Sequence, residues 1–398
     1  MNKPSFRLQV PILTVIRTLI NTMYRMIYPF LGVFRDGLGV SLPALSLVLT
    51  VRSLLGACGP FLATIGDSRG RKTGMVVGMS LMVAGAAVVA IWPTYPAFFI
   101  ALLLMVLGKY AHDPSLLAYL GDRVPYQRRG FIIAISEMGW SLAFIVGVPL
   151  VGLLIAKSGW PAPFRWFTLL GSVALGVIIW MIPKDAVVQR NGFPLWSNFK
   201  NVLTYTPAIV GMLIGVFVSS ANEVVNTVFG VWMEDAFGLK IAALGMASAV
   251  IGISEFSGEL FVIGFTDRLG KAKAVSLGLV LNSISALLLP VLARNTWGAL
   301  LGLFLLYITF EFTLVSVIPM MTEIMPTYRA TMTAFSAASH SLGRAIGAPI
   351  ATLLYSSQTW FVNLPLPAIT GNVLAAILLN LLSLFSVQYL VRKLKFKG

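Results

Sequence analysis

Eleven ionisable residues lie inside long apolar stretches of the chain, where a charge must be paired or must do chemistry. They are the acids Asp113, Glu137, Glu223, Glu255, Glu259 and Glu311 and the bases Arg17, Arg25, Arg52, Lys109 and Arg344. A charge that faces hydrocarbon costs at least about 2.5 kcal/mol, so these side chains should face protein or water. There a carboxyl group can take up and release a proton, and a cationic group can hold an anion. The alternative is that these charges pair with one another and only hold or gate the structure.

Glu255 and Glu259 form the pair best suited to proton uptake. They lie four residues apart and therefore share one face of a helix. Two like charges on one face in a low dielectric are costly to ionise together, which favours one of them holding a proton. The alternative is that Glu259 meets water at the membrane surface or pairs with Lys271.

The basic residues of the first half point to anion binding or to internal pairing. Arg25 lies within the first apolar stretch and is followed by Tyr28 and Pro29. It is expected either to hold an anionic group of a substrate or to pair with an acid of another helix. Lys109 and Asp113 lie four residues apart, so an internal pair between them is the alternative to a substrate contact.

The two halves of the chain differ in the sign of these charges. Bases outnumber acids in the first half, and acids outnumber bases in the second. A cavity with one basic and one acidic wall would follow, with consequences for substrate charge and proton coupling. No metal site is expected, because His112 and Asp113 are adjacent and should point to different helix faces.

The composition shows what kind of protein must position these residues. Of the 398 residues, 58% are hydrophobic and only 11% are charged. A soluble protein carries about 25% charged residues, so the chain is predicted to be an all-α polytopic membrane protein. The net charge of +15 comes from basic residues in short connections between apolar stretches, which is typical of membrane topology and not of nucleic-acid binding. Cys58 is the only cysteine, so no disulfide can form within the chain.

Twelve membrane-spanning helices are expected, because runs of about 20 apolar residues cross a bilayer. The first six cover about 10–33, 42–65, 73–93, 97–120, 131–156 and 166–183, and the second six cover about 207–233, 242–266, 274–293, 298–321, 331–356 and 367–390. Arg17 and Arg25 in the first stretch favour a retained helix over a cleaved signal peptide. With both termini in the cytoplasm, most of the 29 Lys and Arg residues fall in cytoplasmic connections, as the positive-inside rule requires.

The charges are distributed among the predicted spans with a period of three. Spans 3, 6, 9 and 12 carry no charged residue, whereas each of the other eight carries at least one. Since charged spans must line protein or water, the charge-free spans are predicted to face lipid. The pattern predicts four three-helix units with the third helix outermost.

The second half of the chain repeats the first at an offset of about 200 residues. The loop Asp67-Ser68-Arg69-Gly70-Arg71-Lys72 returns as Asp267-Arg268-Leu269-Gly270-Lys271. Asp122-Arg123-Val124-Pro125 likewise matches Glu323-Ile324-Met325-Pro326, and Gly147-Val148-Pro149 matches Gly347-Ala348-Pro349. Three features at one offset predict two parallel six-helix bundles, residues 1–183 and 207–398, joined by a cytoplasmic loop at 184–206.

These features resemble the major facilitator superfamily. Its loop after the second helix reads roughly Gly-x-x-x-Asp-Arg/Lys-x-Gly-Arg-Arg/Lys, which Asp67, Gly70, Arg71 and Lys72 match, and Asp267, Arg268, Gly270 and Lys271 match the second copy. The resemblance covers the whole chain. It implies a twelve-helix transporter whose two loops latch the cytoplasmic side during turnover.

The function expected from these observations is secondary active transport of a small solute by alternating access. Six acids within the spans favour proton coupling, and the frequency of exporters in the family slightly favours export. The alternatives are an uptake symporter or uniporter and, in another class, a transporter-like receptor or scaffold without flux. No enzyme activity, cofactor, metal or nucleic acid is expected. The expected partners are the substrate, protons and the lipid bilayer of the plasma (inner) membrane, and the chain is expected to act as a monomer.

Overall fold

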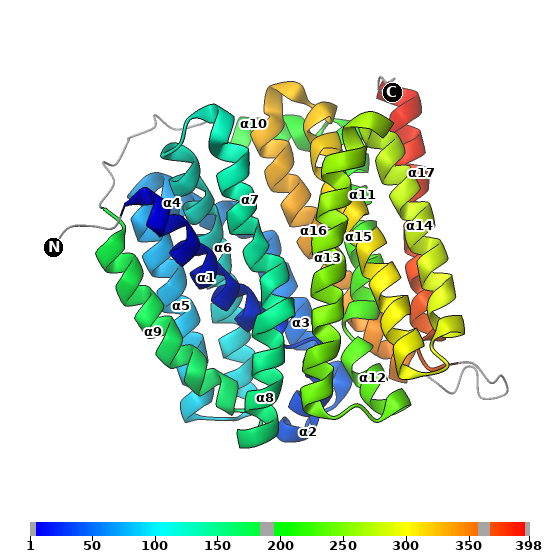
Figure 1. Ribbon diagram of the computed structural model, residues 1–398. Helices are drawn as coiled ribbons and strands as arrows, with labels where there is room; N and C mark the ends of the chain where they lie inside the picture. The colour runs from blue at the N-terminus through cyan, green and yellow to red at the C-terminus, as the bar shows by residue number, and fades with distance from the viewer. Residues whose placement is uncertain (1–4, 184–194, 357–366, 395–398) are drawn as a thin grey trace. The chain divides into compact units, whose positions relative to one another are not determined.

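The computed structural model describes residues 5–183, 195–356 and 367–394, except for the side chains of 63–65, 67, 126–127, 130, 195–198, 263–264, 267, 330 and 356. All regular structure in this part of the chain is helical (Figure 1). The first half contains α1 (Phe6–Arg25), α2 (Leu31–Leu38), α3 (Leu42–Ala57), α4 (Gly59–Arg69), α5 (Arg71–Ile91), α6 (Tyr95–Asp122), α7 (Tyr126–Leu142), the π-helix η1 (Ala143–Gly147), α8 (Val148–Ser158) and α9 (Ala162–Met181). The remainder contains α10 (Leu195–Leu203), α11 (Thr206–Asn226), α12 (Phe229–Phe237), α13 (Ile241–Leu269), α14 (Lys271–Leu292), α15 (Thr296–Ile324), the 3₁₀-helix η2 (Pro326–Tyr328), α16 (Arg329–Ser356) and α17 (Thr370–Leu394).

Most of these helices meet the length and composition that a membrane crossing requires. Among the described residues nine helices do so, or ten if α2 and α3 count as one broken span. Several predicted spans are built from two pieces: α1 is followed by α2 after the turn at Tyr28 and Pro29, and α3 is followed by α4 after Cys58. The predicted span at 131–156 is α7, η1 and α8, so a π turn comes directly before Val148 and Pro149.

The contacts within the chain define two compact units. Unit 1 consists of residues 1–40, 58–191 and 241–249, and unit 2 consists of 41–57, 192–240 and 250–398. The units thus follow the predicted halves apart from two exchanged segments. One is α3, which packs on α16 in unit 2. The other is the start of α13, where Gly245 approaches Gly152 of α8 in unit 1.

Among the nine described helices that qualify as spans, the four charge-free ones are the least enclosed. The most apolar windows of α5, α9, α14 and α17 are 33–44% buried, compared with 50–61% for the other helices that qualify as spans. Figure 1 shows α9 beside α5 in unit 1 and α17 beside α14 in unit 2. This arrangement accords with the expectation that the third helix of each group faces lipid.

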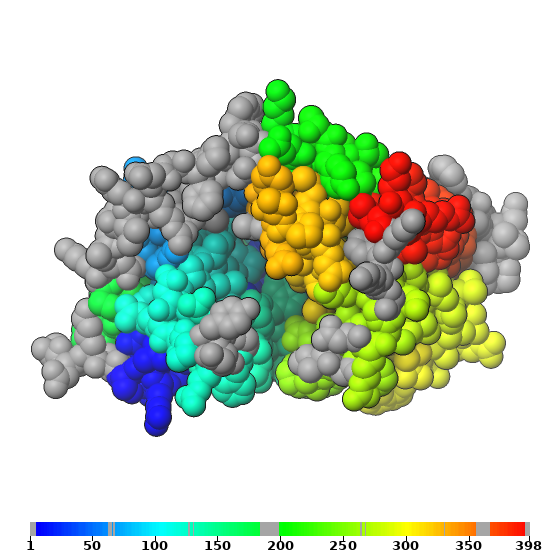
Figure 2. Space-filling model, turned by 90° about the horizontal axis from the view of Figure 1, so that it is seen from above, coloured from blue at the N-terminus to red at the C-terminus, as the bar shows by residue number. Residues whose placement is uncertain are grey.

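The core of unit 2 extends to one end of its bundle, where α10 covers it. Val202 of α10 packs with Met332 of α16 and Leu390 of α17, and all three are buried. Figure 2 shows α10 in green beside α16 in orange and α17 in red. The described part of the predicted loop at 184–206 is therefore an ordered helix that lies on the bundle. Residues 184–194 lie outside the described part of the chain.

Candidate functional site

Each unit contains a group of buried ionisable side chains between its helices. We call the group in unit 1 the α1–α6–α7 cluster, after the helices that supply it. Its α1 residues are Arg17, Asn21, Tyr24 and Arg25, which are spaced so that they share one helix face. All four are at least nine-tenths buried. The bundle, and not solvent, must therefore balance their charges and hydrogen bonds.

Asp113 of α6 is the acidic centre of the α1–α6–α7 cluster. Its Oδ2 atom lies 2.6 Å from Nζ of Lys109 and 3.9 Å from Nε of Arg17. Its Oδ1 atom lies 3.2 Å from Nδ1 of His112. The pair between Lys109 and Asp113 that the spacing left open is therefore present, and Lys109 also donates a hydrogen bond to Oδ1 of Asn21. The same ammonium group thus ties α6 to α1.

Glu137 of α7 is the second acid of the cluster and shares Arg17 with Asp113. Nη2 of Arg17 donates to Oε2 of Glu137 over 2.9 Å, and Nη1 donates to Oγ of Ser136 over 3.2 Å. The Glu137 side chain is 40% exposed, whereas that of Asp113 is 13% exposed. Glu137 is therefore the acid of this pair that water or a diffusing proton reaches more easily.

Arg25 lies against aromatic rings at one end of the cluster. Its guanidinium carbon is 4.1 Å from the ring centre of Trp140 and 3.5 Å from that of Phe144. It also donates a hydrogen bond to the backbone oxygen of Trp140 over 3.0 Å. Nζ of Lys109 lies 5.4 Å from the Trp140 ring, within the range of a cation–π interaction. The sequence analysis did not foresee these aromatic contacts, and both of its alternatives for Arg25, a substrate anion and an acid of another helix, stay predictions.

Unit 2 contains the second group of buried ionisable residues. Arg52 of α3, Glu223 of α11, Glu255 of α13 and Glu311 of α15 are each at least 96% buried. Oε1 of Glu223 accepts a hydrogen bond from Oγ1 of Thr227 over 3.3 Å. Arg344 of α16 donates from Nη2 to Oγ of Ser341 over 3.4 Å, and Glu259 of α13 is half-buried.

Glycines bring the helices of unit 2 together at its acids. A Cβ atom at position 258, between Glu255 and Glu259, would lie 2.9 Å from Cβ of Glu311. A Cβ atom at position 347, three residues after Arg344, would lie 2.7 Å from Cβ of Glu223. Small residues let helix backbones approach closely in membranes. The sequence therefore places Glu311 against α13 and Glu223 against α16.

The two repeated loops each end one helix and begin the next with a glycine. Gly70 and Gly270 have φ values of 96° and 85°, a region that favours glycine. Nε of Arg71 lies 3.4 Å from Oδ2 of Asp122, and Lys271 pairs in the same way with Glu323.

Lys72 of the first loop and Arg268 of the second differ in their surroundings. Lys72 donates a hydrogen bond to the backbone oxygen of Ile179, whereas Arg268 is exposed. The side chains of Asp67 and Asp267 lie outside the described residues. The described contacts therefore place the basic residues of each loop within the unit to which the loop belongs.

Several polar and aromatic partners escaped the sequence analysis because they carry no charge. They are Asn21, Ser136, Trp140 and Phe144 in unit 1 and Thr227, Asn226 and Tyr307 in unit 2. The available signal was helical spacing: Asn21 lies four residues after Arg17, Trp140 lies three after Glu137, and Thr227 lies four after Glu223. His340 of α16 is buried and shares a hydrogen bond between its Nδ1 and Oγ of Ser219.

A helical membrane protein with an internal repeat and a buried charged group in each unit is typical of polytopic transport proteins. Comparison with known families specifies the class. The sequence profile of the Major Facilitator Superfamily matches residues 13–218 and again 211–387. The chain therefore belongs to this superfamily of membrane transporters, and the predicted fold, all-α with twelve spans in two six-helix bundles, is confirmed.

Individual relatives agree with this assignment. The chain is 24% identical to the MFS-type transporter YbcL of Bacillus subtilis over 361 residues, which cover 88% of this chain and 91% of YbcL. It is 22% identical to the quinolone resistance protein NorA of Staphylococcus aureus over 366 residues, covering 90% and 92%.

Solved structures show the same fold. A bacterial homologue of the human lysosomal transporter Spinster matches with a TM-score of 0.73 at 15% identity, over 100% of this chain and 97% of that one. A peptide transporter POT in complex with sulfate matches with a TM-score of 0.77 at 14% identity, over 98% and 97%.

Proposed function

We propose that this protein is a secondary active transporter that moves a small solute by alternating access and couples the movement to protons. The observation that carries the coupling is Arg17, which contacts both Asp113 and Glu137. Two acids share one guanidinium, so a proton on either acid weakens its hold on Arg17. The cation is then available to a substrate anion or to another partner.

Glu137 is the acid that we expect to exchange the proton. Its side chain is the more exposed of the two, and Asp113 has Lys109 and His112 as additional neighbours. Protonation of Glu137 therefore removes its charge-assisted hydrogen bond to Arg17 while the remaining contacts of Asp113 persist. Glu255, Glu259, Glu223 and Glu311 remain the candidates for coupling in unit 2, with Arg52 and Arg344 as their candidate basic partners.

The conformational part of the proposal rests on the repeated loops. The pairs Arg71–Asp122 and Lys271–Glu323 hold each loop against the end of a helix in its own unit. We propose that Asp67, Gly70 and Lys72, with Asp267, Arg268 and Gly270, form latches at the cytoplasmic surface. Both termini are proposed to lie on this side as well. We slightly favour export of the solute. The alternatives are uptake by a symporter and transport by a uniporter.

Flux measurements in proteoliposomes test the proposal. Candidate solutes are first selected by thermal shift of the purified protein, and their flux is then measured with and without a pH gradient. Glu137→Gln is expected to abolish the response to the gradient, whereas Asp36→Asn, a change in an exposed surface pair, should leave it intact. Flux that ignores the gradient in the unmodified protein would indicate uniport. Binding without any flux would indicate a receptor or scaffold and would contradict the proposal.

A further inference from the structure

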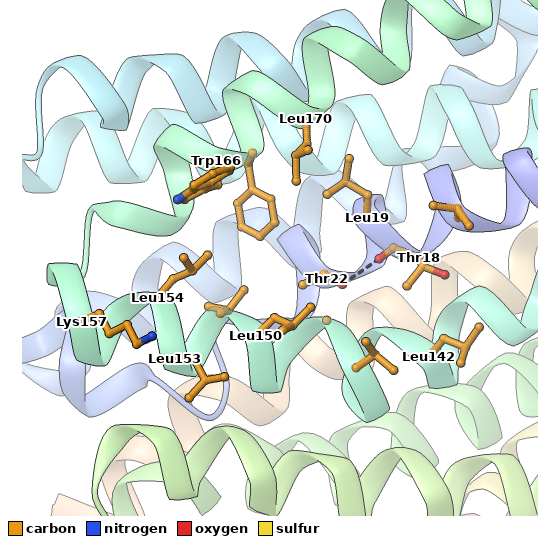
Figure 3. A pocket seen from close by; sticks show the side chains of 15 residues that line it. Thr18, Leu19, Thr22, Leu142, Leu150, Leu153, Leu154, Lys157, Trp166 and Leu170 are labelled. Carbon is orange, nitrogen blue, oxygen red and sulfur yellow. Dashed lines mark hydrogen bonds between the residues drawn. The ribbon is translucent and has the colours of Figure 1, made fainter.

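An apolar groove of about 600 Å³ lies on unit 1 and is built by one unit alone. It runs between α1, the α7–η1–α8 segment and α9 (Figure 3). Leu150 and Leu153 of α8 and Leu170 of α9 line it and are 45–54% exposed. Because these helices lie in a bilayer, exposed leucines here face hydrocarbon and not water. The groove is separate from the α1–α6–α7 cluster described above.

The floor of the groove offers no free hydrogen-bond donor to a ligand. Thr18 and Thr22 of α1 form it, and their hydroxyls donate to the backbone oxygens of Thr14 and Thr18 in their own helix. Figure 3 shows the second of these bonds as a dashed line. Gly147 lets this part of α1 approach η1, since a Cβ atom there would lie 1.9 Å from Oγ1 of Thr22. A polar solute would lose its hydration in the groove without compensation, so the fitting occupant is a hydrocarbon chain.

One end of the groove differs from the rest. Figure 3 shows Lys157 and Trp166 at this end and Thr18 and Leu142 at the other. Lys157 lies in the last turn of α8 and makes no ion pair or hydrogen bond with any residue that the structure describes. Tryptophan favours the boundary between hydrocarbon and headgroups, and lysine extends its charge into that boundary. This end therefore lies at headgroup level.

The length of the groove suits a lipid of one leaflet. From Leu142 to Lys157 the helix rises by roughly 22 Å at 1.5 Å per residue. The hydrocarbon of one leaflet is roughly 15 Å thick, half of the bilayer core. A chain that starts at Lys157 therefore has apolar walls along its whole course through the leaflet.

We propose that the groove binds an anionic phospholipid, with one acyl chain along Leu150, Leu153 and Leu170 and the phosphate group at Lys157. The ammonium group supplies the complementary charge, and the apolar walls supply the contact with the chain. The inference rests on the membrane location of unit 1 and not on the direction or coupling of transport. The site fastens α9 to α1 and α8 through the lipid.

Photo-crosslinking in proteoliposomes tests this site. The probes are phosphatidylglycerol and phosphatidylcholine with the same diazirine-bearing acyl chain, together with a diazirine fatty alcohol that has no phosphate. Labelled peptides are identified by mass spectrometry. Phosphatidylglycerol should label α8 and α9 more strongly than phosphatidylcholine, by about fivefold for one lysine near an anionic group. Leu153→Trp should reduce labelling by both lipids, because it fills the groove.

Two controls make the result specific. Lys157→Gln should remove the preference for phosphatidylglycerol and Lys157→Arg should keep it, whereas Arg294→Gln, an exposed charge in unit 2, should have no effect. A second groove between α14 and α17, lined by Leu279, Ile284 and Leu381 and without a charged residue, should show no headgroup preference.

Three results would overturn the proposal. Equal labelling by the two lipids in the unmodified protein would mean that the groove is an ordinary lipid-facing surface. Stronger labelling by the fatty alcohol would make it a site for neutral apolar molecules, including transported ones. A phosphatidylglycerol preference that survives Lys157→Gln would place the headgroup elsewhere.

Discussion

Replacing Gly147 by alanine should destabilise unit 1, even though alanine is the better helix former. A Cβ atom at position 147 would lie 1.9 Å from Oγ1, 2.8 Å from Cγ2 and 2.9 Å from Cβ of Thr22. Rotation of the threonine side chain removes the first overlap but leaves the last, so α1 and η1 must separate. Overpacking of this kind costs about 1–3 kcal/mol. The intrinsic gain of alanine over glycine in a helix, about 1 kcal/mol, offsets only part of this cost.

Gly176 of α9 provides the matched control for this change. It lies in a membrane-spanning helix of the same unit, and a Cβ atom there would meet no atom within 4 Å. Gly176→Ala should therefore raise the melting temperature of the purified protein slightly, whereas Gly147→Ala should lower it by several degrees. The measurement is thermal unfolding in one detergent at one protein concentration, followed by light scattering and intrinsic fluorescence.

The double variant Gly147→Ala, Thr22→Ala separates steric overlap from other causes. Removal of Oγ1 and Cγ2 leaves only the contact with Cβ, so the second substitution should recover part of the lost stability and give a measurable coupling between the sites. If Gly147→Ala is as stable as Gly176→Ala, or if Thr22→Ala gives no recovery, α1 and η1 do not approach as closely as described and the reasoning is refuted.

Three further predictions concern topology, coupling and the loops. Single cysteines at positions 35, 72, 240 and 271 in a Cys58→Ser background should react with an impermeant thiol reagent only at 35 and 240, and the reverse pattern would invert the predicted orientation. Glu255→Gln and Glu259→Gln should change the pH dependence of flux without loss of folded protein, and wild-type flux of both at every pH would make these acids structural. Lys271→Ala and Glu323→Ala should each lower the free energy of unfolding by at most about 1 kcal/mol, because the pair is partly exposed. A large loss of turnover with a normal melting temperature would support a gating role for the pair. Normal turnover would argue against one.

The fold followed from the sequence because hydropathy and charge are strong constraints in a bilayer. Spans without a charge identified the least enclosed helices, α5, α9, α14 and α17, since only the charged spans are obliged to find polar surroundings. The internal repeat predicted which loops would correspond. The structure shows equivalent ion pairs in the two loops, Arg71 with Asp122 and Lys271 with Glu323, which the sequence analysis did not predict.

The partners of the charged residues could not be predicted to the same degree. Arg25 packs on Trp140 and Phe144, and this choice depends on the azimuth of α7 and on the π turn that follows it. Neither the azimuth of α7 nor the π turn can be predicted from hydropathy, because the helix is apolar on all sides. The sequence also could not predict that α3 belongs to unit 2 and the start of α13 to unit 1. Each segment is part of a span whose remainder belongs to the other unit.

The repeat retains glycines at equivalent helix contacts in the two halves. The glycines that bring helices together recur: Gly78 and Gly278 allow close packing of α5 on α6 and of α14 on α15, and Gly147 and Gly347 do so for η1 on α1 and α16 on α11.

The buried charges do not recur. At the same offset Lys109, Asp113 and Glu137 correspond to Thr309, Thr313 and Ala337, whereas Glu223, Glu311 and Arg344 correspond to Met23, Ala111 and Phe144. A bundle with the same helix packing therefore forms with or without each of these charges. Burying a charge is costly and the packing does not require it, so the proposal that some of these residues serve proton or substrate binding gives a reason for their presence. The duplicated scaffold therefore carries buried charges whose balance differs in sign between its two halves.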